Sequence, residues 1–379
     1  MMNQTAPLAA PGLRGEPLSP GNKKIRILIV DDSVVIRRFI TNALAQEPSF
    51  EVVGSAANGI LALQKAAELK PDVITLDIEM PEMDGLATIR KLREMACGAY
   101  VIMCSTLTSR GASATIDALM MGANDYVTKP SNSGPMDSAL VMLRDELIPK
   151  IKQFFLEKRR HAPPLRPLPP LSPSASPRAV LVPAFLARQE RKVLAIGVST
   201  GGPTALMEIL PMFPVTFPLP IVIVQHMPPL FTKLLAERLR AQSSLDVVEA
   251  TTGMVLKPGR AVIAPGDFHM RLRRGTNEVS IALDQAPREN SCRPAVDVLF
   301  RSAAEVYSGG VIGVILTGMG QDGLRGVEQL KQKGAYIIAQ DQSTSVVWGM
   351  PGAIVDAGLA DSIVALRSIV PEILRQVAR

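Results

Sequence analysis

The sequence predicts an α/β protein built from two doubly wound domains, each with a sheet of mostly parallel strands. Three observations support this prediction. Short apolar runs alternate with helical patterns in two separate series along the chain. A segment rich in proline and basic residues divides the two series. The chain of 379 residues is also long for a single hydrophobic core and comfortable for two.

The first domain is predicted over residues 25–155, where five apolar segments are each followed by a helical pattern. Repeats of this kind form a parallel sheet with helices on both faces. The predicted strands cover residues 25–30, 51–56, 72–77, 100–105 and 125–130. The predicted helices cover residues 33–46, 58–69, 84–95 and 111–121, with a fifth amphipathic helix that ends at 155.

The second domain is predicted over residues 191–379, and its apolar segments alternate with helices in the same way. The predicted strands cover residues 193–198, 221–226, 261–265, 311–318 and 335–340, and the clearest helices cover 229–242, 295–307 and 323–333. A further apolar segment, residues 279–284, indicates an antiparallel excursion from the parallel sheet. We therefore expect a second α/β domain of mostly parallel strands.

Two segments outside these domains lack the patterns of folded structure. Residues 1–24 contain proline and charge where a secretory signal needs an apolar core, so we interpret them as a disordered leader. Residues 156–190 include the run HAPPLRPLPPLSPSASP, which favours a solvated linker. Residues 157–192 hold eight basic residues and two glutamates, enough to account for the whole net charge of +6.

Composition also excludes several classes of protein. No apolar stretch approaches the roughly 20 residues that span a bilayer, so no transmembrane segment is predicted. The basic linker lacks interleaved aromatic residues, which argues against nucleic-acid binding and leaves a weak contact with an acidic partner as the alternative. The three cysteines, Cys97, Cys104 and Cys292, have no metal-ligand spacing and an odd number. They indicate a reducing, cytoplasmic environment.

Chemically active side chains follow the predicted strands of the first domain at one edge of its sheet. Asp31 and Asp32 follow the first strand, Asp77 ends the third, and Ser105 and Lys129 lie at the ends of the fourth and fifth. Carboxylate oxygens suit Mg²⁺, which needs few protein ligands, and we expect Asp31 to act through water. A carboxylate accepts a phosphoryl group once a metal ion and an ammonium group neutralise the transferred oxygens. This edge therefore predicts a phosphorylation site.

Three segments of this domain resemble the signature segments of two-component receiver domains: IRILIVDDS, TLDIEMPEMDG and DYVTKP, within about residues 25–148. The resemblance implies a flavodoxin-like receiver that a histidine kinase phosphorylates on Asp77. It implies Mg²⁺ binding by a set of four residues, namely Asp31, Asp32, Asp77 and, through its backbone carbonyl, Glu79. It also implies that Lys129 and Ser105 contact the phosphoryl group and that Tyr126 reorients, because nearly two added negative charges pull these groups inward.

The second domain begins with a pattern typical of a nucleophile elbow. Gly197, Ser199 and Gly201 form a Gly-x-Ser-x-Gly sequence directly after a predicted strand, and Gly202-Pro203 suits the start of a helix. Backbone amides at such a helix start help to stabilise an oxyanion. The alternative is a phosphate-cradling loop, although the spacing matches neither a Walker A sequence nor Gly-x-Gly-x-x-Gly.

A serine nucleophile needs a base, and the base needs a third group to orient it. Of the three histidines, His161 lies in the linker and His269 lies in or just after a turn, whereas His226 ends a strand at the same sheet edge as Ser199. Asp322 follows the strongest apolar strand and is the best-placed acid, with helix capping as an equal alternative on local grounds. The order Ser, His, Asp differs from that of α/β-hydrolases. The sequence therefore predicts a Ser-His-Asp triad outside that superfamily.

Four segments resemble the motifs of the chemotaxis protein-glutamate methylesterases (CheB family): GVSTGGPTAL, VQHMPPLFTKLLAERL, APGDFHM and LTGMGQDGLRG. The resemblance covers about residues 191–375. It implies that Ser199 is the nucleophile, His226 the general base and Asp322 the orienting carboxylate, with Thr200 and the Met319 backbone amide as candidates for oxyanion support. The implied substrates are glutamate methyl esters and glutamines on chemotaxis receptors, hydrolysed without a cofactor in this domain.

Two alternatives of other classes stay open at this point. The second domain could only bind partners, with Ser199, His226 and Asp322 in structural roles. It could also be an esterase for small metabolites. Reaction with a fluorophosphonate probe, blocked by Ser199→Ala, distinguishes an esterase from a domain that only binds partners. Methanol release from methylated receptors, compared with hydrolysis of simple esters, distinguishes a receptor esterase from an esterase for small metabolites.

Overall fold

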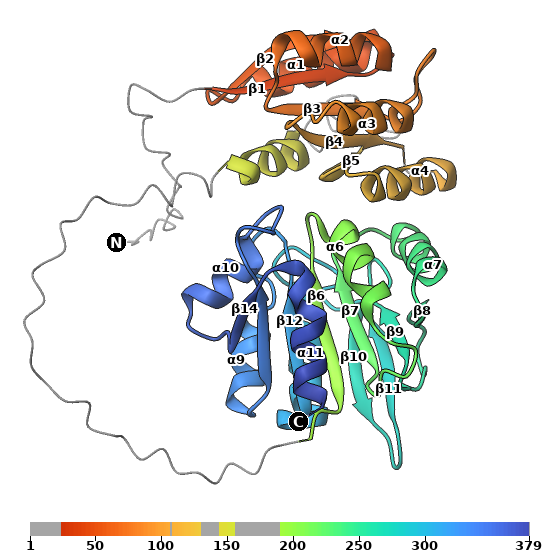
Figure 1. Cartoon of the computed structure of the whole chain (residues 1–379), viewed down its shortest axis with the longest axis vertical. Helices are drawn as coiled ribbons and strands as arrows, with labels where there is room; N and C mark the ends of the chain where they lie inside the picture. Colours follow the sequence, from red (N-terminus) through yellow and green to blue (C-terminus); the bar gives the residue numbers. More distant parts are fainter. Residues whose placement is uncertain (1–23, 107, 130–143, 156–189, 379) are drawn as a thin grey trace, which may run out of the picture.

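The computed structural model describes residues 24–106, 108–129, 144–155 and 190–378. The predicted leader over residues 1–24 and the predicted linker over 156–190 lie almost wholly outside the described residues. The described residues form an N-terminal and a C-terminal α/β unit, which pack against each other in Figure 1. Within the described ranges, no helix is both long and apolar enough to span a bilayer.

The N-terminal unit contains a five-stranded sheet with the order β2-β1-β3-β4-β5, and neighbouring strands in it pair in parallel. This is the 2-1-3-4-5 order of flavodoxin-like folds. The strands are β1 Ile25–Val30, β2 Phe50–Ala56, β3 Val73–Asp77, β4 Tyr100–Ser105 and β5 Asp125–Thr128. The helices are α1 Val34–Ala45, α2 Gly59–Leu69, α3 Gly85–Glu94 and α4 Ser109–Met120, and residues 144–155 are also helical.

The helices of this unit begin where a short polar side chain caps them. The residues before α1 to α4 are Ser33, Asn58, Asp84 and Thr108, and each accepts a hydrogen bond from a backbone amide of the first turn. Such a side chain satisfies one of the amides that a helix start leaves without a partner. The caps explain why the predicted helix starts agree with the observed ones within two residues.

The C-terminal unit contains a seven-stranded sheet with the order β14-β13-β12-β6-β7-β9-β8, again with parallel pairings throughout. Its strands are β6 Val193–Val198, β7 Ile221–Gln225, β8 Asp246–Glu249, β9 Arg260–Ile263, β12 Val311–Ile315, β13 Tyr336–Gln340 and β14 Ser362–Val364. A separate antiparallel hairpin pairs β10 His269–Arg274 with β11 Val279–Asp284. The hairpin confirms the antiparallel excursion that the sequence predicts over residues 279–284.

Helices cover both faces of the seven-stranded sheet (Figure 1). One core contains residues of α6 Gly202–Ile209, α7 Phe231–Gln242 and α11 Ile369–Val377. The other contains residues of α8 Val296–Tyr307, α9 Leu324–Gln332, α10 Gly349–Asp356 and the hairpin. The short 3₁₀ helices are η1 Leu210–Met212, η2 Ser308–Gly310 and η3 Leu366–Ser368. Both units are thus doubly wound α/β structures, as predicted.

Candidate active site

Three predicted site residues meet at the carboxyl edge of the seven-stranded sheet. Ser199 follows β6, His226 follows β7, and Asp322 lies in the loop between β12 and α9. The three strands are neighbours in the order β12-β6-β7. Adjacent parallel strands deliver the residues after them to the same edge, which is where α/β folds place their functional groups. The Ser199 amide also donates to the carbonyl oxygen of Thr317 at 3.0 Å, which ties the serine to the loop after β12.

Ser199 sits on a sharp turn between β6 and α6. Gly201 has a φ of 76°, and a Cβ added to it would lie 2.7 Å from Val346, so only glycine fits there. The side-chain amide of Gln225 donates to the carbonyl oxygen of Ser199 at 2.9 Å. The strand, the turn and the following helix match the context that a nucleophile elbow requires.

The imidazole of His226 and the carboxylate of Asp322 form a direct pair. Their Nε2 and Oδ2 atoms are 2.8 Å apart, and the Asp322 side chain is 2% exposed. The alternative of helix capping describes only a small part of its role. Asp322 accepts a hydrogen bond from the Gly323 amide, but its other partners are the amides of Val296 and Asp297 and the side chains of His226 and Asn290.

The other ring nitrogen of His226 faces a cysteine. Its Nδ1 atom lies 3.6 Å from the Sγ atom of Cys292. Within the part of the chain that the structure describes, no hydrogen bond joins the Ser199 hydroxyl to the His226 ring. The sequence predicts a hydrogen-bonded line of Ser199, His226 and Asp322, and this conformation contains the His226–Asp322 half of it. Because Nε2 is hydrogen-bonded to Asp322, Nδ1 is the ring nitrogen that is available to take a proton from a nucleophile.

Electrostatics favour the protonated form of His226 in this conformation. Burial by itself lowers the pKa of the imidazole, but the contacts with Asp322 and Cys292 outweigh it and raise the pKa to about 10. Burial raises the pKa of Asp322, whereas its hydrogen bond with His226 and the charge of that ring hold it below its ordinary value. The result is an ion pair between an imidazolium and a carboxylate.

A cavity of about 410 Å³ lies over these groups, and both units contribute to its wall. From the C-terminal unit come Ser199, Thr200, His226, Asn290, Cys292 and Met319, among others. From the N-terminal unit come Leu119, Asn124, Asp125, Tyr126 and Lys150. Thr200 and Met319, predicted to support an oxyanion, are therefore in the same cavity as the predicted nucleophile.

Polar contacts between the units reach the residue beside Ser199. The hydroxyl of Thr200 donates to the Asp125 carboxylate at 3.0 Å, and the Gln153 amide lies 3.4 Å from the same hydroxyl. Lys150 in turn donates to Asp125 at 3.0 Å and to the Tyr126 carbonyl oxygen at 2.6 Å. The N-terminal unit thus holds the first turn after the elbow by a buried network.

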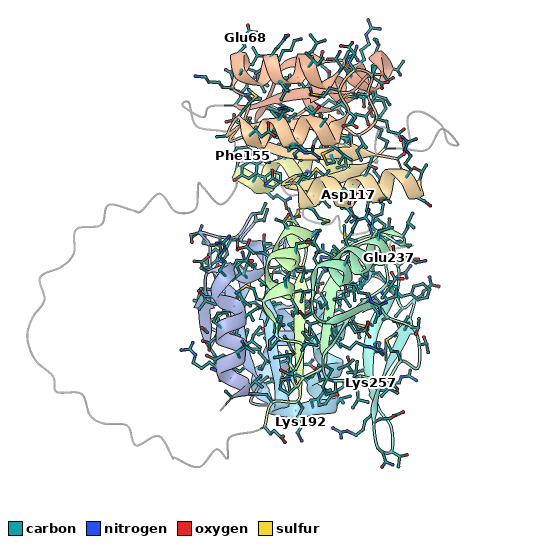
Figure 2. All side chains as sticks on the ribbon, turned by 45° about the vertical axis from the view of Figure 1, so that its right-hand side comes forward. Glu68, Asp117, Phe155, Lys192, Glu237 and Lys257 are labelled. Carbon is teal, nitrogen blue, oxygen red and sulfur yellow. The ribbon has the colours of Figure 1, made fainter. Side chains whose placement is uncertain are left out.

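Further contacts join α4 and β5 to α6 and α7. The rings of Tyr126 and Phe231 stack with centroids 4.9 Å apart, and the Arg238 guanidinium binds both carboxylate oxygens of Asp117 at 2.8 and 3.2 Å. Figure 2 labels Asp117 and, from the facing helix α7, Glu237 at this boundary. Tyr126, predicted to be a switch residue, therefore packs on the C-terminal unit. The aromatic packing and the ion pair extend the contact away from the cavity.

The carboxyl edge of the N-terminal sheet holds the predicted phosphorylation site. Carboxylate oxygens of Asp31, Asp32 and Asp77 lie within 4.8 Å of one another, an arrangement that fits a divalent cation. The Lys129 Nζ atom is 2.7 Å from an oxygen of Asp31 and 2.7 Å from an oxygen of Asp77. Burial raises the pKa of Asp77 to about 6, although the charge of Lys129 opposes this shift. Ser105 ends the neighbouring strand β4.

The structure also places Glu79 and two of the three histidines, His269 and His161, relative to these sites or outside the described residues. The Glu79 side chain forms an ion pair of 3.4 Å with Arg110 and is not among the clustered carboxylates of the described residues, and the role of its backbone carbonyl stays a prediction. His269 is fully buried, and its Nε2 atom lies 3.1 Å from the carbonyl oxygen of Pro287. His269 is thus a structural residue. His161 lies outside the described residues.

Sequence reasoning missed the site contributions of Asn290, Cys292, Asp125 and Lys150. The first two occupy one loop between β11 and α8 and contact Asp322 and His226. The last two belong to the other unit. No periodic pattern marks these four residues, because each acts through a contact with a segment remote in sequence.

Comparison with known proteins matches both units to families. Residues 27–140 match the model of the response regulator receiver domain, and residues 194–373 match that of the CheB methylesterase. A solved CheB methylesterase catalytic domain from Thermotoga maritima is 46% identical, covers 49% of this chain and 98% of its own, and aligns with a TM-score of 0.48.

Curated relatives match the chain over nearly its whole length. The protein-glutamate methylesterase/protein-glutamine glutaminase of Trichodesmium erythraeum is 50% identical over 357 residues, 93% of this chain and 99% of that protein. A protein of the same name from a Nocardioides species is 48% identical over 358 residues, 94% of this chain and 96% of that protein. The chain therefore belongs to the CheB methylesterase family, with a response regulator receiver domain ahead of the methylesterase domain.

Proposed function

We propose that the protein is a phosphorylation-activated hydrolase that demethylates glutamate methyl esters on chemotaxis receptors through Ser199, His226 and Asp322. The observation that carries this proposal is the 2.8 Å pair of His226 and Asp322, in one cavity with Ser199 on its elbow. The names of the curated relatives support the choice of a glutamate methyl ester as substrate.

Hydrolysis proceeds in two steps. The Ser199 hydroxyl attacks the ester carbonyl while His226 Nδ1 takes its proton, and the methoxy group leaves as methanol with that proton. Water then attacks the acyl-enzyme, with His226 again as the base, and releases glutamate and free Ser199. Asp322 stabilises the imidazolium that forms in each step, and amides near Thr200 and Met319 support the oxyanion. With a glutamine side chain as substrate, ammonia leaves in place of methanol.

The receiver unit takes its phosphoryl group on Asp77 from a histidine kinase. Asp31, Asp32, Asp77 and the Glu79 carbonyl would hold Mg²⁺, which supplies positive charge to the transferred oxygens when it is bound. The carboxylate of Asp77 forms the new bond to phosphorus while the bond from phosphorus to the kinase's histidine nitrogen breaks and the imidazole leaves, and Lys129 and Ser105 contact the transferred oxygens. Lys129 now bridges Asp31 and Asp77, so phosphorylation changes its partners.

Strand β5 connects the phosphorylation site to the esterase cavity. Lys129 follows the strand, while Tyr126 packs on Phe231 and Asp125 accepts a hydrogen bond from Thr200. We infer that the unphosphorylated receiver covers the cavity, and that a rearrangement of Lys129 and Tyr126 weakens this cover. In the covered form a protonated His226 is also a poor base.

Methanol release from receptor membranes that carry labelled methyl esters tests the function. The full chain should release methanol, faster with a small-molecule phosphodonor, whereas simple esters should react more slowly. Ser199→Ala should lose hydrolysis and fluorophosphonate labelling but still accept phosphate, and Asp77→Asn should keep the basal rate without stimulation. A chain whose Ser199 never reacts with the probe would leave only a partner-binding role for the second domain.

The proposal also names partners and a compartment. The partners are a chemotaxis histidine kinase and the cytoplasmic domains of methyl-accepting receptors, and nucleic acid is not among them. Three free cysteines support a reducing, cytoplasmic location. The proposed esterase chemistry uses side chains, backbone amides and water.

A further inference from the structure

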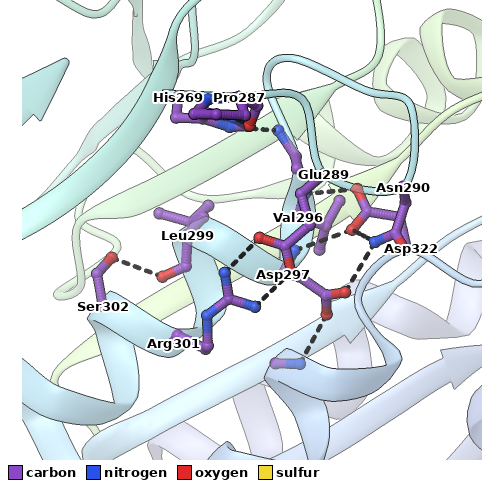
Figure 3. Close-up of polar contacts among 12 residues, drawn as sticks. His269, Pro287, Glu289, Asn290, Val296, Asp297, Leu299, Arg301, Ser302 and Asp322 are labelled. Atoms are coloured by element: carbon purple, nitrogen blue, oxygen red, sulfur yellow. Dashed lines mark hydrogen bonds and ion pairs between the residues drawn. The ribbon is translucent and has the colours of Figure 1, made fainter. Parts of the chain in front are cut away.

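One loop crosses over the catalytic carboxylate and places a side-chain amide on it. Asn290, between β11 and α8, has a φ of 51°, a left-handed conformation that asparagine tolerates better than most residues. Its Nδ2 atom lies 2.8 Å from Oδ1 of Asp322 and 2.9 Å from Oδ2 of Asp297 (Figure 3). The two N–H groups of one amide thus serve two carboxylates.

Both of these carboxylates are buried, and they lie side by side. Asp322 is 2% exposed and Asp297 is 1% exposed, and the Asp297 amide donates to Asp322 at 3.1 Å. Burial raises the pKa of Asp297, and the charge of Asp322 raises it further. A neutral amide between them donates to each without adding a positive charge that would compete with His226 for Asp322. A third acid, Glu289, is neutralised separately by two bonds from Arg301.

The donors around Asp322 explain what Asn290 adds. The amide of Val296 and the ring of His226 bind Oδ2, whereas the amides of Asp297 and Gly323 bind Oδ1 together with Asn290. Within the described residues, Asn290 and His226 are the two side chains that bond this carboxylate. Asn290 therefore opposes His226 across the carboxylate and holds its plane in the orientation that points Oδ2 at Nε2. Without Asn290, three backbone amides still bind the carboxylate, but Oδ1 loses its side-chain donor and the plane is held less tightly.

The loop that carries Asn290 is itself braced. Glu289 and Cys292 exchange two backbone hydrogen bonds of 3.1 and 2.8 Å across the turn. Buried His269 accepts a hydrogen bond from the Ala295 amide on Nδ1 at 3.3 Å, so its Nε2 carries the proton and donates to the Pro287 carbonyl oxygen. Figure 3 shows the His269 ring above this loop. These hydrogen bonds restrain the backbone of the loop on which Asn290 lies.

We propose that Asn290 is a positioning residue of the esterase, which orients Asp322 and through it the His226 ring. This inference rests on the proposed triad and extends it by one residue. Hydrogen-bond partners in the outer shell of metal ligands are typically worth about 10- to 100-fold in affinity or activity. We expect a loss of the same order in kcat for Asn290→Ala, with little change in KM, because Asn290 acts through Asp322.

A double-mutant cycle in the full chain tests this directly. Asn290→Ala should lower the kcat of methanol release about 10- to 100-fold in the wild-type background, but less than about 3-fold when Asp322 is already Asn. Asn277→Ala is the matched control, because Asn277 is exposed in the turn between β10 and β11. A loss of equal size in both backgrounds, or a kcat equal to that of the control, would overturn the inference.

A spectroscopic measurement separates this inference from the esterase proposal. The proton between His226 and Asp322 should give a downfield proton resonance in the wild-type chain and in Asn277→Ala. That resonance should weaken or disappear in Asn290→Ala, even if the wild-type chain releases no methanol. An unchanged resonance in Asn290→Ala would refute the positioning role, whereas a wild-type chain without esterase activity would refute the proposed function.

Discussion

Replacing Arg238 with alanine should raise the basal esterase rate without phosphorylation. Arg238 on α7 binds both carboxylate oxygens of Asp117 on α4 and lies 3.1 Å from the Ser113 hydroxyl, so it joins the two units outside the cavity. If the receiver covers Ser199, each contact that holds it in place lowers the fraction of open molecules. Removing this contact therefore increases that fraction.

The structure sets the size of the expected effect. The side chains of Arg238 and Asp117 are 38% and 30% exposed, so solvent screens the pair. Partly exposed pairs contribute about 0.2–1 kcal/mol, and the bidentate geometry places this one near the upper end. Since 1 kcal/mol corresponds to about a 5-fold change in an equilibrium, the basal rate should rise about 2- to 5-fold.

Labelled methanol release from the full chain measures this change, with and without a phosphodonor. The rate with phosphodonor should be the same in Arg238→Ala and wild type, because the cover is then already weakened. Added salt should raise the basal rate of the wild type toward that of the variant. The control is Arg240→Ala, since Arg240 lies on the same helix but pairs with Asp246 of its own unit at 3.1 Å. A basal rate in Arg238→Ala equal to that of wild type and control would refute occlusion.

Three further predictions follow from the site. Contacts with Asp322 and Cys292 raise the pKa of His226 from 6.5 to about 10, so basal activity should increase as the pH rises toward about 10. The stability that these contacts contribute should be complete below about pH 6.5 and should be lost as the pH rises to about 10. Cys292→Ala should move both the activity profile, measured by rate assays, and the stability profile, measured by denaturant unfolding, to lower pH. Iodoacetamide should inactivate the wild type and Cys97→Ala but not Cys292→Ala, since Cys292 lines the cavity, and equal inactivation rates would contradict this role. Gly253→Ala, at a φ of 82° with open space around it, should lose only the about 1–3 kcal/mol due to backbone strain in denaturant unfolding. Gly201→Ala adds a clash with Val346 to the same kind of strain, so it should lose more stability than Gly253→Ala and should abolish hydrolysis.

The comparison of β10 with β11 shows where sequence patterns fail. Residues 279–284 are recognisable as a strand, and β11 covers the same residues. Its partner β10 reads His-Met-Arg-Leu-Arg-Arg, with two apolar residues among three arginines and a histidine, and its burial does not alternate strictly, because His269 is buried beside Met270 and the last two arginines are both exposed. The edge strands β8 and β14 have only four and three residues, too few for a period of two to be seen. Pairing with a neighbouring strand, and not intrinsic preference, creates these strands.

The order of apolar segments determined both α/β units and the sheet edge on which Ser199, His226 and Asp322 lie, because parallel strands that are buried on both faces leave a strong local pattern. The acids before α1 and at the end of β3, with Lys129, were predictable for the same reason. The tertiary structure alone decided that Asn290 bonds Asp322, that Cys292 faces His226 and that Asp125 of one unit holds Thr200 of the other. These contacts join segments far apart in the chain, and they depend on the packing of loops and units, for which no local pattern exists.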